Sequence, residues 1–174
     1  MKRFIIILPL LITVFLFVIL LIYLLQNKDP RKPPSALLNQ PLPEFYIKGL
    51  INEDTILSNN TIKNKITLIN FFASWCAPCK VEHPLLMNLK KKYPELTIVG
   101  INFKDNNEDA IKFLLSTGNP YNFVGVDNDG AIGLEFGVFG LPETFFVNNQ
   151  GKIIFKQTGP LTKKIIQNDI IPNL

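Results

Sequence analysis

The sequence predicts an α/β domain with a mixed β-sheet, preceded by one membrane-spanning helix. Strand and helix patterns alternate from residue 66 to residue 136. Two further strand patterns then flank the turn sequence at residues 148–151, as in an antiparallel hairpin. Helices packed on a mixed sheet are the usual result of such an order. The membrane helix is predicted from a 22-residue apolar run, residues 4–25.

This apolar run predicts an uncleaved signal anchor. About 20 apolar residues cross the hydrocarbon core of a bilayer. A cleavable signal peptide has an apolar core of about 7–15 residues followed by small residues at the cleavage site. The run here is longer and leads into a Pro-rich, charged segment. An uncleaved anchor is therefore favoured over a cleavable signal peptide. The chain is thus divided into an anchor (1–25), a linker (26–36) and a domain (37–174).

The charges near the anchor do not decide its orientation. Two basic residues precede the span and three follow it, namely Lys2, Arg3, Lys28, Arg31 and Lys32. The net charge of +4 comes entirely from this region, since the chain from Leu37 onward has 13 lysines and 13 acidic residues. A nucleic-acid-binding domain needs clustered positive charge of its own. Nucleic-acid binding is therefore excluded.

The domain is expected to begin with a β-hairpin within residues 42–57, around Gly49 and Asn52. Periodicity and turn residues predict the elements that follow. The strands are expected at 66–72, 97–103, 123–126, 144–147 and 152–157. The helices are expected at 78–92, 107–116, 132–136 and 162–171.

Both cysteines of the chain lie in the segment Trp75-Cys76-Ala77-Pro78-Cys79, at a strand-to-helix junction. The positive end of a helix dipole favours a thiolate, and thiol pKa values in such motifs fall to about 3.5–7.5. We therefore expect Cys76 to be the nucleophile and the less exposed Cys79 to resolve the mixed disulfide. A structural disulfide closing so small a loop would stabilise little. A zinc site needs about four ligands, but the chain adds only His83 to the two cysteines.

Residues 70–79 resemble a thioredoxin-fold active site. The extension at residues 80–84 is similar to that of membrane-tethered reductases of cytochrome c biogenesis, a group related to the TlpA/ResA-like reductases. Residues 100–105, 125–127 and 137–145 resemble the CcmG/DsbE type in particular. The resemblance extends from about residue 38 to residue 160.

This resemblance implies a thioredoxin fold and a protein thiol:disulfide oxidoreductase that needs no bound cofactor. The implied substrate is the Cys-X-X-Cys-His disulfide of apocytochrome c, reduced before haem attachment. The implied electron donor is a membrane protein of the DsbD/CcdA kind. The implied location is the bacterial inner membrane, with the soluble domain on the periplasmic side.

The resemblance also implies a substrate-binding wall. Pro142 matches the family's cis-proline, which faces the disulfide, and the Leu141 backbone would pair with an extended substrate segment. Trp75 is expected to shield the thiolate and contact substrate. Glu143 is assigned to the same wall, because acids at matching positions in relatives lie near the dithiol.

The sequence allows two interpretations of the role of Glu82. By itself it would be a solvated surface acid, as would Glu143. In relatives, acids at these positions raise the thiol pKa, and one of them could assist proton transfer at Cys79. Asn70 stands where many thioredoxins have a buried aspartate, which favours Glu82 for this role. His83 is read as a helix-surface residue, and Tyr121 and Phe139 as packing residues.

Two other functions stay open at this point. One is a general periplasmic disulfide oxidase or isomerase, because thioredoxin-like proteins have potentials from about −270 to −120 mV. The other is a tethered chaperone that binds apocytochrome at Leu141 and Pro142, with redox chemistry secondary.

Overall fold

The computed structural model describes residues 2–25 and 36–174 and separates into two units after Pro34. The first unit contains the helix α1 (Lys2–Leu25). Its segment Ile7–Leu25 has a mean hydropathy of 3.1 and is long and apolar enough to cross a membrane. These properties fit a membrane anchor and a signal sequence alike. The predicted linker at 26–36 lies outside the described residues, apart from its last residue.

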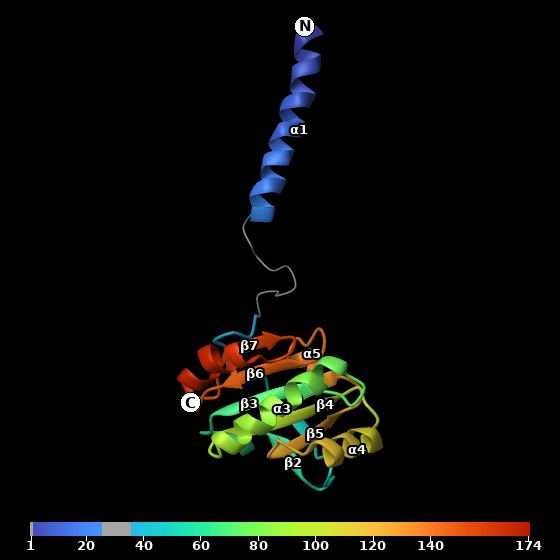
Figure 1. Ribbon diagram of the computed structural model, residues 1–174, viewed down its shortest axis with the longest axis vertical. Coiled ribbons are helices and arrows are strands. Elements are labelled where there is room, and N and C mark those ends of the chain that lie inside the picture. Colours follow the sequence, from blue (N-terminus) through green and yellow to red (C-terminus); the bar gives the residue numbers. More distant parts are fainter. Residues whose placement is uncertain (1, 26–35) are drawn as a thin grey trace. The chain divides into compact units, whose positions relative to one another are not determined.

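A five-stranded mixed sheet forms the centre of the second unit, in the order β5-β4-β3-β6-β7 (Figure 1). The central strand β3 is parallel to β4 and antiparallel to β6. All six residues of β3 are buried, which accounts for its continuous apolar sequence. The strands are β3 (Thr67–Phe72), β4 (Thr97–Phe103), β5 (Phe123–Asp127), β6 (Glu143–Val147) and β7 (Ile153–Thr158). The predicted mixed sheet is confirmed.

Two hydrophobic cores lie on the two faces of this sheet. On one face, α3 (Ala77–Lys92), α4 (Asn107–Thr117) and the C-terminal helical segment pack against alternate residues of the strands. The other face is covered by the N-terminal hairpin, α2 (Asn59–Ile62) and the end of α5 (Ala131–Glu135). Because side chains alternate along a strand, neighbouring residues of β3 and β6 belong to different cores.

The predicted N-terminal hairpin is present as β1 (Tyr46–Lys48) and β2 (Ile56–Ser58). It is joined to the edge of the sheet by a bridge between Gly49 and Gly125. A Cβ atom on Gly125 would lie 2.7 Å from the Cδ1 atom of Ile47, so a glycine is needed for this close approach.

The C-terminal segment differs from the single helix predicted for residues 162–171. It contains α6 (Lys163–Ile165), a π-helical turn (Ile166–Ile170) and a 3-10 turn (Ile171–Asn173). Pro172 has no N–H group to continue an α-helix, which accounts for the tightened last turn. The short helix α2 was not predicted.

Candidate active site

Cys76 and Cys79 form a disulfide at the start of α3, with an S–S distance of 2.02 Å. Cys76 is the N-cap residue of the helix, and its sulfur accepts a hydrogen bond from the Cys79 N–H at 3.2 Å. Each cysteine is 3% exposed. The expectation that Cys79 is less exposed is therefore wrong for the disulfide form. The two sulfurs differ instead in position, because only Cys76 caps the helix and meets its positive end.

Asp105 fixes the loop between β3 and the disulfide. Its carboxylate accepts hydrogen bonds from the Ser74 N–H at 2.6 Å and the Ser74 hydroxyl at 2.8 Å. The Trp75 indole N–H donates to the Lys104 carbonyl at 3.1 Å. Trp75 stays 61% exposed. Asp105 was not predicted as a site residue.

Pro142 follows a cis peptide bond from Leu141, as the resemblance implied. Residue Glu143 of β6 pairs with Phe71 of β3 in antiparallel register. The residues just before β6 therefore lie beside the loop that follows β3, which leads to Cys76. Leu141 also packs against the core that contains both cysteines. The cis-proline segment and the disulfide thus belong to the same end of the sheet.

Glu82 is buried in a polar network rather than solvated. Its two carboxylate oxygens accept hydrogen bonds from the Asn70 amide at 2.8 Å and from the Leu161 N–H at 2.7 Å. The Asn70 amide also donates to Thr144 at 3.0 Å, and its oxygen accepts from the Tyr121 hydroxyl at 2.8 Å. Since residues three apart on a helix are neighbours, with Cβ atoms about 5–6 Å apart, Glu82 lies next to Cys79.

Burial raises the pKa of the Glu82 carboxyl from 4.5 to about 7, against the lowering effect of the hydrogen bonds from Leu161 and Asn70. Burial also raises the pKa of the Tyr121 phenol, and the nearby Glu82 carboxylate raises it further. Asn70 has no titratable proton. Among these groups, Glu82 is therefore the one whose pKa lies near neutral pH.

His83 is buried, so the prediction of a helix-surface residue is wrong. Its Nε2 atom lies 2.9 Å from the Gly118 carbonyl oxygen and 3.1 Å from the Thr117 hydroxyl. Its ring packs edge-on against Phe113, with centroids 4.8 Å apart. Burial lowers the pKa of the imidazole, opposed by the hydrogen bond to Gly118. His83 thus joins α3 to the end of α4 and is occupied there.

Glu143 is also buried, which overturns its reading as a solvated acid. It pairs with Phe71 in the register of β3 and β6, whereas Asn70, on the other face of β3, bonds Glu82. Glu143 therefore points to the face of the sheet opposite α3. One of its oxygens lies 2.9 Å from the Lys156 ammonium, and the other accepts from the Phe139 N–H at 3.2 Å.

The two aromatic residues expected to pack differ from each other. Tyr121 packs as expected, stacked on Phe72 with centroids 5.0 Å apart. Phe139 is 77% exposed, so its prediction as a packing residue is wrong.

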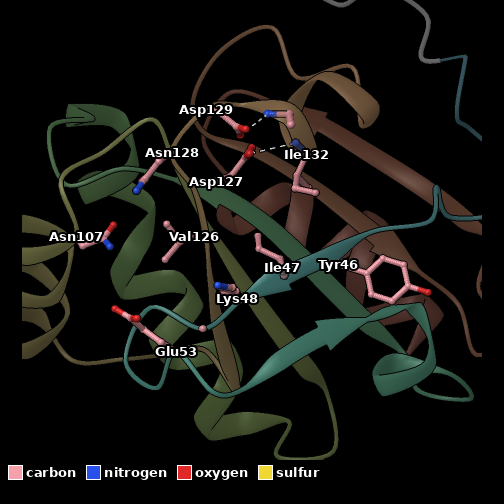
Figure 2. Close-up of a pocket in the computed structure, with 12 residues that line it drawn as sticks. Tyr46, Ile47, Lys48, Glu53, Asn107, Val126, Asp127, Asn128, Asp129 and Ile132 are labelled. Carbon is pink, nitrogen blue, oxygen red and sulfur yellow. Dashed lines mark hydrogen bonds between the residues drawn. The ribbon is translucent and has the colours of Figure 1, made fainter.

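A hollow of the domain lies away from the disulfide. It has a volume of about 540 Å³ and lies between β1 and the loop after β5 (Figure 2). Neither cysteine lines it. Asp127, at its wall, accepts hydrogen bonds from the Ile132 and Gly133 N–H groups and so caps α5. Among residues 2–25 and 36–174, no group of three or more His, Cys, Asp or Glu residues could hold a metal ion.

A disulfide at a helix N-terminus can undergo exchange: an external thiolate opens it, or its own thiolate opens another disulfide. Cys76 and Cys79 have this strand-to-helix position, at the same end of the sheet as the cis-proline segment. The protein is a thiol:disulfide oxidoreductase with a thioredoxin-like fold.

Comparisons with known proteins specify the family. The redoxin family model matches residues 37–170. The thiol:disulfide interchange protein HelX of Rhodobacter capsulatus is 41% identical, over 87% of this chain and 85% of that protein. DsbE of Escherichia coli is 35% identical, over 99% of this chain and 94% of that protein. The chain belongs to the redoxin family and, within it, to the DsbE-type thiol:disulfide interchange proteins.

Solved structures agree on the fold. A DsbF homologue from Corynebacterium diphtheriae has a TM-score of 0.69 and 24% identity, and covers 78% of this chain and 87% of its own. A secreted Mycobacterium tuberculosis disulfide oxidoreductase homologous to E. coli DsbE has a TM-score of 0.65 and 19% identity, over 74% of this chain and 95% of its own.

Proposed function

We propose that this protein is a membrane-anchored reductase that opens the disulfide of the Cys-X-X-Cys-His segment of apocytochrome c before haem attachment. The observation that supports it most directly is the Cys76–Cys79 disulfide at the start of α3, beside Leu141 and Pro142. The relatives named thiol:disulfide interchange proteins support the reaction class, and the length and apolar character of α1 support attachment to a membrane. The inner membrane and the periplasmic side are part of the proposal.

In the proposed reaction, the Cys76 thiolate attacks one sulfur of the substrate disulfide. A mixed disulfide forms, and the second substrate sulfur leaves as a thiolate that takes up a proton. Cys79 then loses its proton and attacks the Cys76 sulfur, which releases the first substrate thiol. The substrate gains two electrons and two protons, and the protein ends with the Cys76–Cys79 disulfide. A membrane dithiol donor of the DsbD/CcdA kind reduces it again.

Glu82 is the group best placed to take the Cys79 proton. It lies one helical turn from Cys79 on the buried side of α3, and its pKa of about 7 suits exchange in either direction. Its charged form would disfavour the Cys79 thiolate, so transfer of the proton to Glu82 removes that repulsion.

Substrate contact would come from Trp75 and from the Leu141 backbone. β6 begins at Glu143, so the Leu141–Pro142 peptide precedes the strand ladder and lies at the end of the sheet near Cys76. An extended polypeptide could pair there through its main chain, which demands little of its side chains.

Trapping of the mixed disulfide tests the proposal. A Cys79→Ala protein lacks the thiol that releases the substrate, so we expect a covalent complex between Cys76 and apocytochrome c, visible on non-reducing gels and lost with dithiothreitol. The matched control is Cys76→Ser, which keeps Cys79 and should trap nothing.

A redox titration of the purified protein decides the direction of electron flow. A potential near the reducing end of the range of about −270 to −120 mV is expected of a reductase. An oxidising potential, or a Cys79→Ala protein that traps no cytochrome under matched expression, contradicts the proposed function.

A further inference from the structure

Lys156 is a buried lysine whose side chain contacts residues on both sides of the cis-proline in the sequence. Its side chain is 8% exposed, although it lies on the last strand of the sheet. Its ammonium lies 2.9 Å from the Glu143 carboxylate and donates a hydrogen bond to the Gly137 carbonyl at 2.8 Å. It also lies 5.4 Å from the centroid of the Phe139 ring and 5.0 Å from that of Phe145.

Residues 137–141, here called the Phe139 loop, connect the end of α5 to Pro142. The Glu143–Lys156 pair holds this loop at three points: the Gly137 carbonyl, the Phe139 N–H and the inner face of the Phe139 ring. Local backbone bonds hold only the start of the loop, from the Gly137 N–H to the Leu134 carbonyl at 2.9 Å and from the Val138 N–H to the Gly133 carbonyl at 2.8 Å. The outer face of Phe139 is left open to solvent.

Phe139 is exposed to solvent and yet fixed by the Glu143–Lys156 pair, and this combination requires an explanation. Phe139 lies two residues before Leu141, which packs against the hydrophobic core that contains both cysteines. Ordering a loop before a partner arrives lowers the entropy that binding must otherwise lose. A rigid aromatic side chain offers a large apolar area for a partner at little entropic cost.

We propose that the Glu143–Lys156 pair is a positioning device that holds Phe139 as an apolar contact for the partner polypeptide. Glu143 and Lys156 are thus positioning residues that do not touch the substrate, and Phe139 is a contact residue. This rests on the proposed function only in that the protein acts on disulfides within polypeptides. The ion pair lies on the sheet face opposite Glu82 and takes no part in proton transfer.

A purely stabilising ion pair would have the same geometry, so the test must separate the two roles. Removal of one partner alone leaves a buried charge unpaired and destabilises the fold. Replacement of both partners by apolar residues of similar size is often neutral for stability. The double variant E143L/K156M therefore retains a packed interior while it loses the donor for Gly137 and the acceptor for Phe139.

The experiment uses the full chain in detergent micelles, reduced by dithiothreitol. The substrates are a disulfide peptide with a Cys-X-X-Cys-His sequence, oxidised insulin and the small disulfide 5,5′-dithiobis(2-nitrobenzoate). For E143L/K156M we expect an unchanged melting temperature and a KM for the polypeptides raised about five- to tenfold, with kcat within about twofold. The rate with the small disulfide should not change, because it makes no contact with Phe139.

A double-mutant cycle with Phe139→Ala identifies the residue through which the pair acts. Phe139→Ala should raise KM by a similar factor, and the triple variant should be no worse than either parent. The matched controls are Leu134→Ala, which removes another exposed apolar side chain (79% exposed), and Lys152→Met at an exposed lysine of the same hairpin. Both should match the wild type.

Independent, additive increases in KM, or an unchanged KM in a folded E143L/K156M protein, would overturn the positioning role. An equal loss of rate with all three disulfides would also overturn it, because it would place the effect on the cysteines. A wild-type protein that reduces insulin but not the haem-motif peptide would remove apocytochrome c as substrate and leave the KM comparison on insulin decisive.

Discussion

Glu82 is the residue at which the stability of the fold and the proposed proton transfer are most closely coupled. Asn70 donates through its amide nitrogen to Glu82 and accepts through its oxygen from Tyr121. An aspartate at position 70 could not donate to a carboxylate when ionised. The amide therefore suits a neighbour that is itself an acid, and the titratable group of the site is Glu82 rather than residue 70.

Glu82 should make the stability of the protein fall as the pH rises. Its pKa is raised from 4.5 to about 7, so the folded protein binds more protons than the unfolded chain between these pH values. The free energy of unfolding then decreases across this window, by about 3 kcal/mol for a shift of this size. Glu82→Gln has no such proton to lose. We expect its urea-unfolding free energy, measured in the oxidised protein, to lack this decrease.

The difference between the two pH profiles is the informative quantity, because other groups titrate in both proteins. Glu135→Gln, at an exposed carboxyl of α5, serves as the control and should follow the wild type. A Glu82→Gln profile parallel to that of the wild type from pH 4.5 to 7 would show that the carboxyl keeps its ordinary pKa.

The burial of Glu82 and His83 could not be predicted from the sequence. Charged and imidazole side chains on a helix are usually exposed, so both residues have an ordinary surface reading. Their hydrogen-bond partners, Leu161 and Gly118, are 79 and 35 residues away in the chain. A local pattern contains no information about such partners. The signals for Glu82 were the acids at matching positions in relatives and Asn70 at the position of the usual buried aspartate.

Strands and helices of the sheet were predictable because their patterns repeat over several residues. β3 and β4 read as apolar runs, and α3 has leucines at helical spacing and Pro78 in its first turn. The helix α2 has only four residues and too little sequence to show a period. Its Asn59 side chain instead bonds the Phe45 N–H at 2.9 Å and the Pro43 carbonyl at 2.9 Å, both distant in sequence.

The conformation of the loop between β3 and α3 should depend on Asp105, which follows the end of the neighbouring strand β4. Asp105 accepts two bonds from Ser74 and further bonds from the Asn102 amide and the Asn106 N–H, both at 2.9 Å. Asp105→Ala leaves these donors without their charged acceptor, and we expect a loss of about 2 kcal/mol or more in unfolding free energy. Trp75, the only tryptophan of the chain, should become more mobile.

Fluorescence of Trp75 measures this directly. Asp105→Ala should lower the anisotropy and increase quenching by acrylamide, without loss of the folded far-ultraviolet spectrum. Asp109→Ala is the matched control, since Asp109 forms only an exposed ion pair with Lys112 at 3.6 Å, which adds little stability. Equal Trp75 anisotropy in the two variants would mean that Asp105 does not hold the loop.

The second unit has hydrophobic cores of its own. Among the described residues, both hydrophobic cores and the residues packed against them begin at Leu37 or later. The cysteines, Glu82 and the cis-proline all lie in the same unit. A fragment of residues 36–174 should therefore match the full chain in reduction potential and unfolding free energy. The full chain should stay with membranes after alkaline carbonate extraction, whereas the fragment should be released.

The residues at the start of this fragment are part of the fold. The Asn39 N–H donates to the Ile153 carbonyl at 2.7 Å, the Ile153 N–H donates to the Gln40 carbonyl at 3.0 Å, and the Leu42 N–H donates to the Gly151 carbonyl at 2.9 Å. These bonds cover part of the outer edge of β7, and Leu42 is buried in the second core. Residues 36–42 show no hydrophobic periodicity, so their sequence did not predict that they pair with the edge of β7.

A fragment that begins at residue 43 tests the importance of this edge. It loses three backbone hydrogen bonds and the burial of Leu42, so we expect its unfolding free energy to be lower by about 3 kcal/mol or more. The comparison is with the fragment that begins at residue 36, under identical buffer and redox conditions. Its reduction potential should change little, because the edge of β7 is two strands away from β3 and the cysteines. Equal unfolding free energies for the two fragments would mean that the domain begins after Leu42.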